Sequence, residues 1–225
     1  MIPLRDTIKS RTVPYVNYML ISMCGAVFLY ELSLGERVVH FIRMTGVTPA
    51  DVSATLFHGR PALRTALTLF TSMFIHGGWM HLLGNMLYLY IFGDNVEDRL
   101  GHGFYLVFYL LCGAGSALVQ VYAGQSSTAP LIGASGAISG VLGAYFLLYP
   151  RARVLTLIPL FVFFPVVEVS AFFFLGFWFL LQFIQGAIAA GGGDAAAGGI
   201  AWWAHAGGFV AGAVLLPVFL LLRKL

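Results

Sequence analysis

Two long stretches with almost no charge constrain the fold of this chain more than any other feature. No acidic or basic side chain occurs from Leu100 to Pro150, and only Glu168 and Asp194 interrupt the apolar background from Val154 to Leu222. A membrane-spanning helix needs about 20 mainly apolar residues. Charged residues make up 9% of the chain, whereas a soluble domain normally carries about 25%. We therefore expect an integral membrane protein, not a soluble globule, a disordered chain or a nucleic-acid platform.

The apolar runs predict an all-α bundle of six transmembrane helices. Backbone polar groups in lipid must be satisfied within their own segment, and the runs lack the alternation of barrel strands. Residues 15–225 are expected to form one membrane domain, preceded by a cytoplasmic segment of residues 1–14. The first span is expected to be a retained signal anchor. The expected spans are 15–34, 78–92, 104–123, 136–149, 169–189 and 201–222.

The connections between the spans follow from turn-forming residues. Three prolines assign Arg151–Glu168 to a cytoplasmic or interfacial connection. Glycines 191–193 and 198–199 predict a flexible outer loop before the last span. The first outer loop, Gly35–Ile75, is expected to be long.

Basic residues set the expected orientation. Their position before the first span and after the last places both termini in the cytoplasm, so the number of spans is even. The long first outer loop carries four arginines against this rule, but the rule weakens in long loops. We expect a multi-pass protein of the cell inner (plasma) membrane. The basic residues on its cytoplasmic side are Arg5, Lys9, Arg11, Arg99, Arg151, Arg153, Arg223 and Lys224.

Polar side chains in the second span indicate a candidate site, because such groups are costly in lipid. His81 and Asn85 stand four residues apart and share one helix face near its outer end. His76 precedes them across two glycines and is expected in the loop just above. Taken singly, each could instead form a hydrogen bond between helices.

A serine stands at the expected start of the fourth span, within Gly133-Ala-Ser135-Gly136-Ala-Ile-Ser139-Gly140. Free backbone N–H groups and the positive helix end favour a developing anion there. A helix of 14 residues covers roughly 21 Å of a hydrocarbon core about 30 Å thick. Ser135 is therefore expected about 9 Å below the outer surface, in a hydrated hollow. For Ser139 we expect a hydrogen bond to its own helix.

The last span begins with His205, which is followed by glycines on the same helix face. Glycines in the fourth span have similar spacing, and both spans descend from the same side. Small residues let two helix backbones approach closely, so Ser135 and His205 are expected to meet. A serine hydroxyl becomes an effective nucleophile when a base within about 2.6 to 3.2 Å takes its proton. The packing glycines are Gly136, Gly140, Gly208 and Gly212.

This set of groups is suited to acyl transfer, which needs a nucleophile, a base and donors for the oxyanion. Ser135 and His205 can supply the first two. The Ser135 backbone N–H, with the side chains of Asn85 and His81, can supply the third. The carboxylates of the chain, Glu31 and Glu168 among them, are expected outside this cluster, so we predict a dyad and not a triad.

The combined motifs resemble those of the rhomboid family of intramembrane serine proteases, in order and spacing, from about Leu69 to Gly212. The resemblance implies a rhomboid-like six-helix protease without a cofactor. It would cut transmembrane segments of single-span or multi-span membrane proteins near the extracytoplasmic face. Ser135 would be the nucleophile and His205 the base, and His81, Asn85 and His76 would serve the oxyanion. The motifs are His76-Gly-Gly-Trp-Met-His81-x-x-x-Asn85, Gly133-Ala-Ser135-Gly136 and Ala204-His205-Ala-Gly-Gly208.

The resemblance extends to residues outside these motifs. Glu97 and Arg99 fit the acidic-x-Arg element after the second span, where their roles would be structural. It also implies that substrates arrive from the lipid between spans two and five, where Trp178 and Gln182 are candidate gate residues. The sequence departs from the family pattern at two places. A bacterial relative has an aromatic residue against the histidine one turn after the nucleophile, and this chain has Ser139 there. The tryptophan-arginine pair that many members carry in the first outer loop is missing before His76.

Other functions stay open as alternatives. A catalytically silent rhomboid-like protein would bind membrane clients without cutting them. A small transporter predicts ionisable residues or broken helices at the midplane, whereas this cluster lies towards one face. A metal site of His76, His81 and His205 is disfavoured, because the chain has no His-Glu-x-x-His helix. The expected partners are membrane-protein substrates and the lipid bilayer, without nucleic acid, and the oligomeric state is left open.

Overall fold

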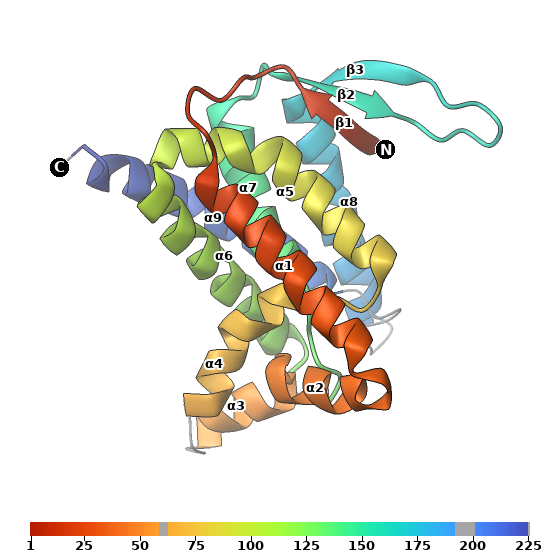
Figure 1. Cartoon of the computed structure of the whole chain (residues 1–225), viewed down its shortest axis with the longest axis vertical. Coiled ribbons are helices and arrows are strands. Elements are labelled where there is room, and N and C mark those ends of the chain that lie inside the picture. Colours follow the sequence, from red (N-terminus) through yellow and green to blue (C-terminus); the bar gives the residue numbers. More distant parts are fainter. Residues whose placement is uncertain (59–62, 192–200, 225) are drawn as a thin grey trace.

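A bundle of helices with a small sheet at one end forms the described part of the computed structural model, residues 1–58, 63–191 and 201–224 (Figure 1). Six long helices make up the bundle: α1 (Tyr15–Ser33), α5 (Trp79–Leu100), α6 (His102–Ala123), α7 (Ser135–Leu148), α8 (Ala171–Gly191) and α9 (Trp202–Leu222). Five short helices lie between α1 and α5: η1 (Gly35–Arg37), α2 (Val38–Thr45), α3 (Pro49–His58), α4 (Leu63–Thr71) and η2 (Ser72–Phe74). The strands are β1 (Ile2–Asp6), β2 (Arg153–Leu157) and β3 (Val166–Ser170).

The long elements of the protein form an all-α membrane bundle. Four described helices, α1, α6, α8 and α9, are long and apolar enough to cross a membrane. The helix α7 is apolar but has only 14 residues, and α5 carries four charged residues among its last seven. The six-span topology therefore stays a prediction where α5 and α7 are concerned.

The helix α7 lies at the centre of the bundle. Every residue from Gly136 to Tyr145 is buried, and α5, α6, α8 and α9 all pack against this helix. Its contact with α9 is especially close. A Cβ atom at Gly208 would overlap the carbonyl oxygen of Gly136, and one at Gly212 would overlap that of Gly140. The expected glycine-lined packing is present, and it brings the first turns of α7 and α9 together.

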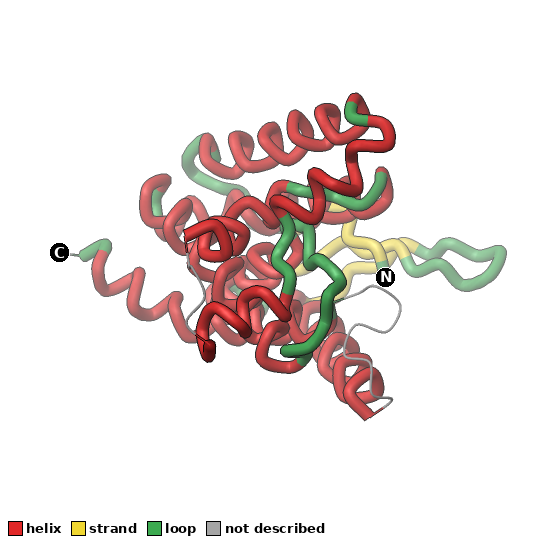
Figure 2. The backbone as a smooth tube through the Cα atoms, turned by 90° about the horizontal axis from the view of Figure 1, so that it is seen from below, coloured by secondary structure: helices red, strands yellow, loops and turns green. Residues whose placement is uncertain are grey.

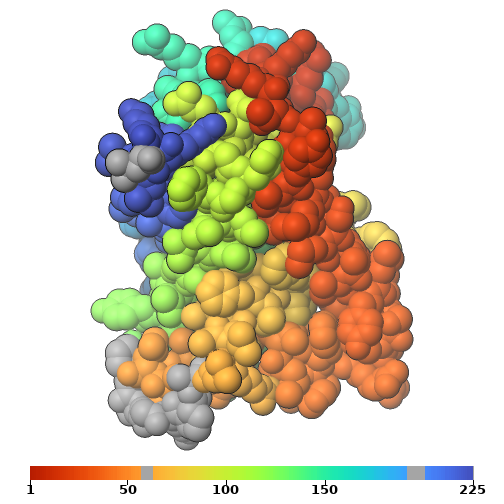
Figure 3. Space-filling model, turned by 60° about the vertical axis from the view of Figure 1, so that its left-hand side comes forward, coloured from red at the N-terminus to blue at the C-terminus, as the bar shows by residue number. Residues whose placement is uncertain are grey.

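The segment expected as a long outer loop is largely helical. Its helices α2, α3 and α4 pack on one another and lie beyond the ends of α1 and α6 (Figures 1 and 3). Paired backbone hydrogen bonds between Val47 and Leu131, 3.0 and 2.7 Å long, join this segment to the stretch before α7. Figure 3 also shows α6 between α1 and α9 on one face.

A three-stranded antiparallel sheet, in the order β1-β2-β3, covers the end of the bundle where α7 finishes (Figure 1). It is fastened to the helices by Asp6, whose carboxylate accepts hydrogen bonds from Tyr145 at 2.5 Å and Asn95 at 3.0 Å. Burial is the main cause that raises the pKa of Asp6. The N-terminal segment is thus packed onto the membrane domain, not separate from it.

Sheet formation also changes one predicted boundary. The fifth span was expected from residue 169, but α8 begins at Ala171 because Val169 and Ser170 still pair with β2. Short runs rich in valine suit a strand as well as a helix. The other long helices match their expected spans within a few residues at their N-terminal ends, whereas α5 continues eight residues further than expected, to Leu100. Apart from Gly191, which ends α8, the glycines of the expected loop before α9 lie outside the described residues.

Candidate active site

Ser135 and His205 lie at the start of two closely packed helices. Ser135 is the first residue of α7, and its Oγ is 2.8 Å from Nε2 of His205 in the first turn of α9. This distance lies within the range in which a base can take a hydroxyl proton. One turn on, the Ser139 hydroxyl donates to the Ser135 carbonyl oxygen at 2.6 Å, the local hydrogen bond expected for it.

Gln182 fixes the other side of the histidine ring. Its Oε1 lies 2.7 Å from Nδ1 of His205, and an amide oxygen can only accept a hydrogen bond. Nδ1 therefore holds the ring proton, and Nε2 presents a lone pair to the Ser135 hydroxyl, which donates. The Gln182 side chain reaches this position from α8 and is buried.

Trp178, one turn before Gln182 on α8, flanks the same imidazole. The two ring centres are 6.0 Å apart with an interplanar angle of 35°. The sequence analysis named Trp178 and Gln182 as candidate gate residues, and the structure places both against His205. Their spacing of four residues could have indicated a shared face, but not which histidine it meets.

His81 and Asn85 of α5 lie beside the start of α7. The Gly77 N–H donates to Nδ1 of His81 at 3.4 Å, so Nε2 of His81 has the proton. A Cβ atom at Gly133 would lie 2.6 Å from this Nε2 and 3.7 Å from Nδ2 of Asn85. Asn85 Nδ2 is buried and has no hydrogen-bond partner among the described residues. Two side-chain donors thus converge just before Ser135.

Gly133 makes this convergence possible. Its φ of +115° lies in a region that side chains with a Cβ rarely adopt, and its N–H donates to the Ser72 carbonyl oxygen at 2.9 Å. Any side chain here would also displace His81. The glycine therefore serves both the turn into α7 and the space in front of the donors.

His76 lies behind His81 and not at the cavity surface. The two ring centres are 5.2 Å apart, and the backbone N–H of His76 donates to the Glu31 carboxylate at 3.2 Å. Glu31, expected outside the cluster, comes from the end of α1 and is buried. Burial first, and His81 second, lower the pKa of His76 to about 4, so its ring is neutral at pH 7. His76 can support His81 but does not line the cavity.

A cavity of about 690 Å³ contains this set of groups. Its walls come from α5, α7, α8 and the start of α9, and they are mainly apolar. Beside the cavity, aromatic rings of α5 and α8 come close to one another: Phe174 lies 6.4 Å from Tyr88 and 6.2 Å from Phe92 between ring centres. The polar residues that line the cavity include His81, Asn85, Ser135, Ser139, Gln182 and His205.

Glu97 and Arg99 lie far from the cavity, at the other end of α5. The buried Glu97 carboxylate accepts hydrogen bonds from the backbone N–H groups of Val16 and Asn17, 3.0 and 2.7 Å long. It thereby satisfies donors in the first turn of α1. Arg99 is exposed, and its carbonyl oxygen accepts a hydrogen bond from Arg223.

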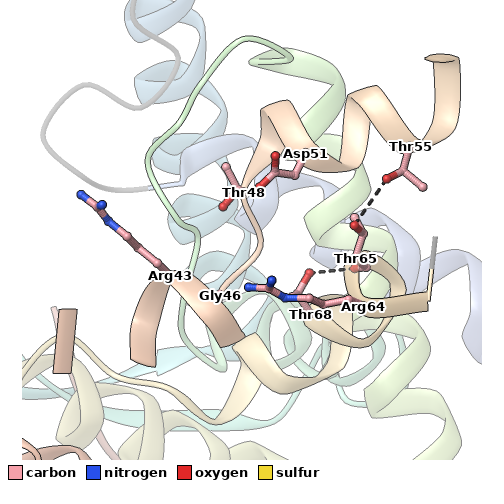
Figure 4. A pocket seen from close by; sticks show the side chains of 8 residues that line it. All are labelled: Arg43, Gly46, Thr48, Asp51, Thr55, Arg64, Thr65 and Thr68. Atoms are coloured by element: carbon pink, nitrogen blue, oxygen red, sulfur yellow. Dashed lines mark hydrogen bonds between the residues drawn. The ribbon is translucent and has the colours of Figure 1, made fainter. Parts of the chain in front are cut away.

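A second cavity, of about 360 Å³, lies among α2, α3 and α4 and shares no lining residue with the first (Figure 4). Its wall is polar, and the Thr55 and Thr65 hydroxyls approach to 3.4 Å across it. Arg43 and Arg64 both line it, but their side chains do not converge on one point (Figure 4). None of the predicted site residues belongs to this cavity.

Comparison with known proteins gives consistent matches. The family model described as the rhomboid domain matches residues 64–222. The chain is 34% identical over 118 residues to rhomboid-like protein 11, chloroplastic, of Arabidopsis thaliana, which covers 52% of this chain and 39% of that protein. It is 32% identical over 152 residues to the presenilin-associated rhomboid-like protein, mitochondrial, of Homo sapiens, covering 59% and 38%. It is 28% identical over 147 residues to rhomboid protease GlpG of Salmonella paratyphi A, covering 64% and 47%. The chain spans less than half the length of each of these relatives.

Proposed function

Because the chain belongs to the rhomboid family, we propose that it is an intramembrane serine endopeptidase that cuts transmembrane segments with a Ser135–His205 dyad. The observation that carries this proposal is the chain of hydrogen bonds from Gln182 through His205 to Ser135, at 2.7 and 2.8 Å. A structural role for these polar groups would not require a serine at a helix start beside the unpaired amide donor of Asn85. The family has both active proteases and inactive members, so activity is the part to be tested.

In the first step, Ser135 Oγ attacks the carbonyl carbon of the scissile peptide while its proton passes to Nε2 of His205. The carbonyl oxygen becomes an oxyanion. The Ser135 backbone N–H, Nε2–H of His81 and Nδ2–H of Asn85 are the donors available to it. A lost donor of this type costs about 2.7 to 4 kcal/mol in a serine protease example.

In the second step, the imidazolium of His205 gives its proton to the leaving amine nitrogen, and an acyl ester on Ser135 remains. Water then attacks this ester with His205 again as the base, which frees the new carboxyl end and restores the hydroxyl. Throughout, the Gln182 amide oxygen keeps the proton on Nδ1. An amide can hold the ring orientation as the third residue of a triad does, without adding a charge.

The substrate class follows from the walls of the cavity. They are mainly apolar, and the cavity is bounded by α5 on one side and α8 on the other. An unwound segment of a substrate's membrane helix would fit such a surface, since an intact helix hides its carbonyl groups in its own hydrogen bonds. We propose lateral access between α5 and α8, as the family resemblance implies.

The protein is a multi-pass membrane protein, and its membrane and orientation belong to the proposal. We place it in the inner (plasma) membrane with both termini in the cytoplasm, so Ser135 lies towards the extracytoplasmic face. The basic residues that follow α9 and precede α1 support this orientation.

Cleavage by pure protein tests the proposal. The full chain in vesicles is incubated with a panel of single-span fusion proteins, together with Ser135→Ala, His205→Ala and a control, Ser33→Ala, which changes an exposed serine outside the site. We expect both site variants to lose at least about a thousandfold in rate, and the control to cut normally. Persistent cleavage by Ser135→Ala would refute the assignment.

A fluorophosphonate probe separates the protease from a silent family member. We expect labelling at Ser135, found by mass spectrometry of the labelled peptide, and we expect it to need His205. If the wild type binds the fusion proteins but neither cuts them nor reacts with the probe, the client-binding alternative is correct.

A further inference from the structure

The loop between β2 and β3, residues 158–165, is the most apolar exposed feature outside the helices. Its five central residues are each more than half exposed, and Phe161 is fully exposed. No charged residue occurs between Arg153 and Glu168. In Figures 1 and 2 this hairpin projects sideways, well beyond the helices. The five residues, called the hairpin tip below, are Leu160, Phe161, Val162, Phe163 and Phe164.

The backbone of the hairpin tip is closed by its own hydrogen bonds. The Leu160 N–H donates to the Phe163 carbonyl oxygen at 2.8 Å, and the Phe163 N–H donates back to Leu160 at 2.9 Å. Below them, the Ile158 N–H donates to Pro165 at 3.0 Å. A segment that leaves water must satisfy its backbone internally, and this hairpin does so along most of its length.

The turn itself has an unusual residue. Phe161 has a φ of +53°, in the left-handed region where glycine, asparagine or aspartate normally stands in a two-residue hairpin turn. An aromatic side chain gains nothing from this backbone conformation and contacts no core residue here. A turn that served only to connect two strands would not require three phenylalanines.

The position of the hairpin indicates what covers its tip. The strand β3 continues directly into the apolar helix α8, so the hairpin leaves the bundle where a membrane helix begins. Its base has the exposed Arg151, together with Arg153, which pairs with Glu168 at 3.2 Å. Basic residues at a helix boundary next to aromatic and aliphatic side chains are typical of the membrane surface.

We propose that the hairpin tip inserts into the lipid leaflet at the end of the bundle farthest from Ser135, as a surface anchor of the membrane domain. The tip enters the boundary between headgroups and acyl chains, while the charged base stays in water. Because β2 also pairs with β1, the anchor ties the N-terminal strand to the same surface. This inference does not rest on the proposed protease activity.

Site-specific fluorescence tests the insertion. A Val162→Cys variant of the full chain is labelled with an environment-sensitive dye and reconstituted in phosphatidylcholine and phosphatidylglycerol vesicles. Cys24 and Cys112 are fully buried, so the introduced thiol is the accessible one among the described residues. The matched control is Arg151→Cys at the base. We expect iodide to quench the label at 162 several-fold less than the label at 151, and lipids with a quencher high on the acyl chain to quench only the label at 162.

A second variant shows whether the side chains of the tip cause the protection. Adding Phe161→Asn and Phe163→Asn to the labelled protein removes the apolar groups, and asparagine tolerates the left-handed backbone at 161. We expect iodide to regain access with an unchanged unfolding temperature, since the tip packs on no core residue.

Two results would overturn the insertion. The first is a label at 162 that iodide reaches as easily as the label at 151 and that lipid quenchers leave unaffected. The second is a label that neither quencher reaches at high protein density but that becomes accessible when the protein is diluted in lipid. In that case a second copy of the chain, and not the lipid, covers the hairpin tip.

Discussion

In the proposed mechanism, the amide of Gln182 does for His205 what a carboxylate does in many serine hydrolases. Replacing it by leucine removes the acceptor for the Nδ1 proton at nearly constant volume, so the ring can turn or change tautomer. We expect Gln182→Leu to lower kcat roughly tenfold to a hundredfold, about 1.4 to 2.7 kcal/mol, with little change in KM. Gln182→Glu keeps an acceptor oxygen and should retain more activity than Gln182→Leu. Equal losses in the two variants would indicate a packing role instead.

His76 makes the stability of the folded protein depend on pH. Its pKa falls from 6.5 to about 4 on folding, so the unfolded chain binds more protons here between those values. Above pH 6.5 the His76 ring is neutral in both states and leaves the free energy of unfolding unchanged. As the pH falls from 6.5 towards 4, the unfolded chain takes up the proton first, so the free energy of unfolding decreases. From pH 7 to pH 5 we expect this residue to account for a loss of roughly 2 kcal/mol.

Thermal unfolding at the two pH values checks this effect. His76→Gln should show a smaller drop than the wild type. His40→Gln, which replaces an exposed histidine, should show the same drop as the wild type. An unchanged pH dependence in His76→Gln would contradict the assignment.

The site residues that could be predicted from the sequence are those that lie close together along the chain or belong to one motif. His81 with Asn85, and the serine between glycines, follow from local pattern. The contact of Gln182 with His205 crosses 23 residues, and that of Glu31 with His76 crosses 45. Such contacts depend on how separate elements pack on one another, which hydrophobic periodicity does not specify.

The glycines between α7 and α9 set the distance between serine and imidazole. In Gly212→Ala, the new methyl group would overlap the Gly140 carbonyl oxygen, so the helices must separate. We expect a destabilisation of about 1 to 3 kcal/mol and a clear loss of cleavage. In Gly25→Ala on α1 nothing lies within 4 Å of the new methyl group. This control should be as stable as the wild type or more stable by up to about 1 kcal/mol, and should therefore unfold at the same or a slightly higher temperature. Equal unfolding temperatures for both variants would contradict the close packing.

Helices and strands differed in how well they could be predicted. The long helices follow from apolar runs of sufficient length, and their starts were close to those observed. The sheet could not be predicted from such runs, because β1 pairs with β2 across the intervening helices α1, α5, α6 and α7, with Ile2 opposite Leu157. The helices α2 to α4 were missed because each has only eight to ten residues, in a segment where arginines and threonines interrupt the apolar side chains.

The cavity between α5 and α8 makes the route of the substrate testable in the assembled protein. Tyr88→Cys with Trp178→Cys, joined by a flexible bifunctional thiol reagent, would bridge its two walls. If substrates arrive from the lipid there, the bridge should slow cleavage of a membrane protein at least about tenfold while a small fluorophosphonate still labels Ser135. The matched control joins α1 to α5 on the outside, through Tyr18→Cys and Tyr90→Cys, whose rings lie 6.5 Å apart. Equal cleavage in both bridged proteins would exclude this route.

The order of the two reactive groups along the chain has a consequence during synthesis. Ser135 begins a helix of 14 residues, too short to cross about 30 Å of hydrocarbon unaided, and its base is made 70 residues later on α9. In the proposed mechanism, a chain that has been synthesised only as far as α7 has its nucleophile but lacks its base. If the proposed dyad is correct, the nascent protein stays unable to cut neighbouring membrane proteins until α9 has been made.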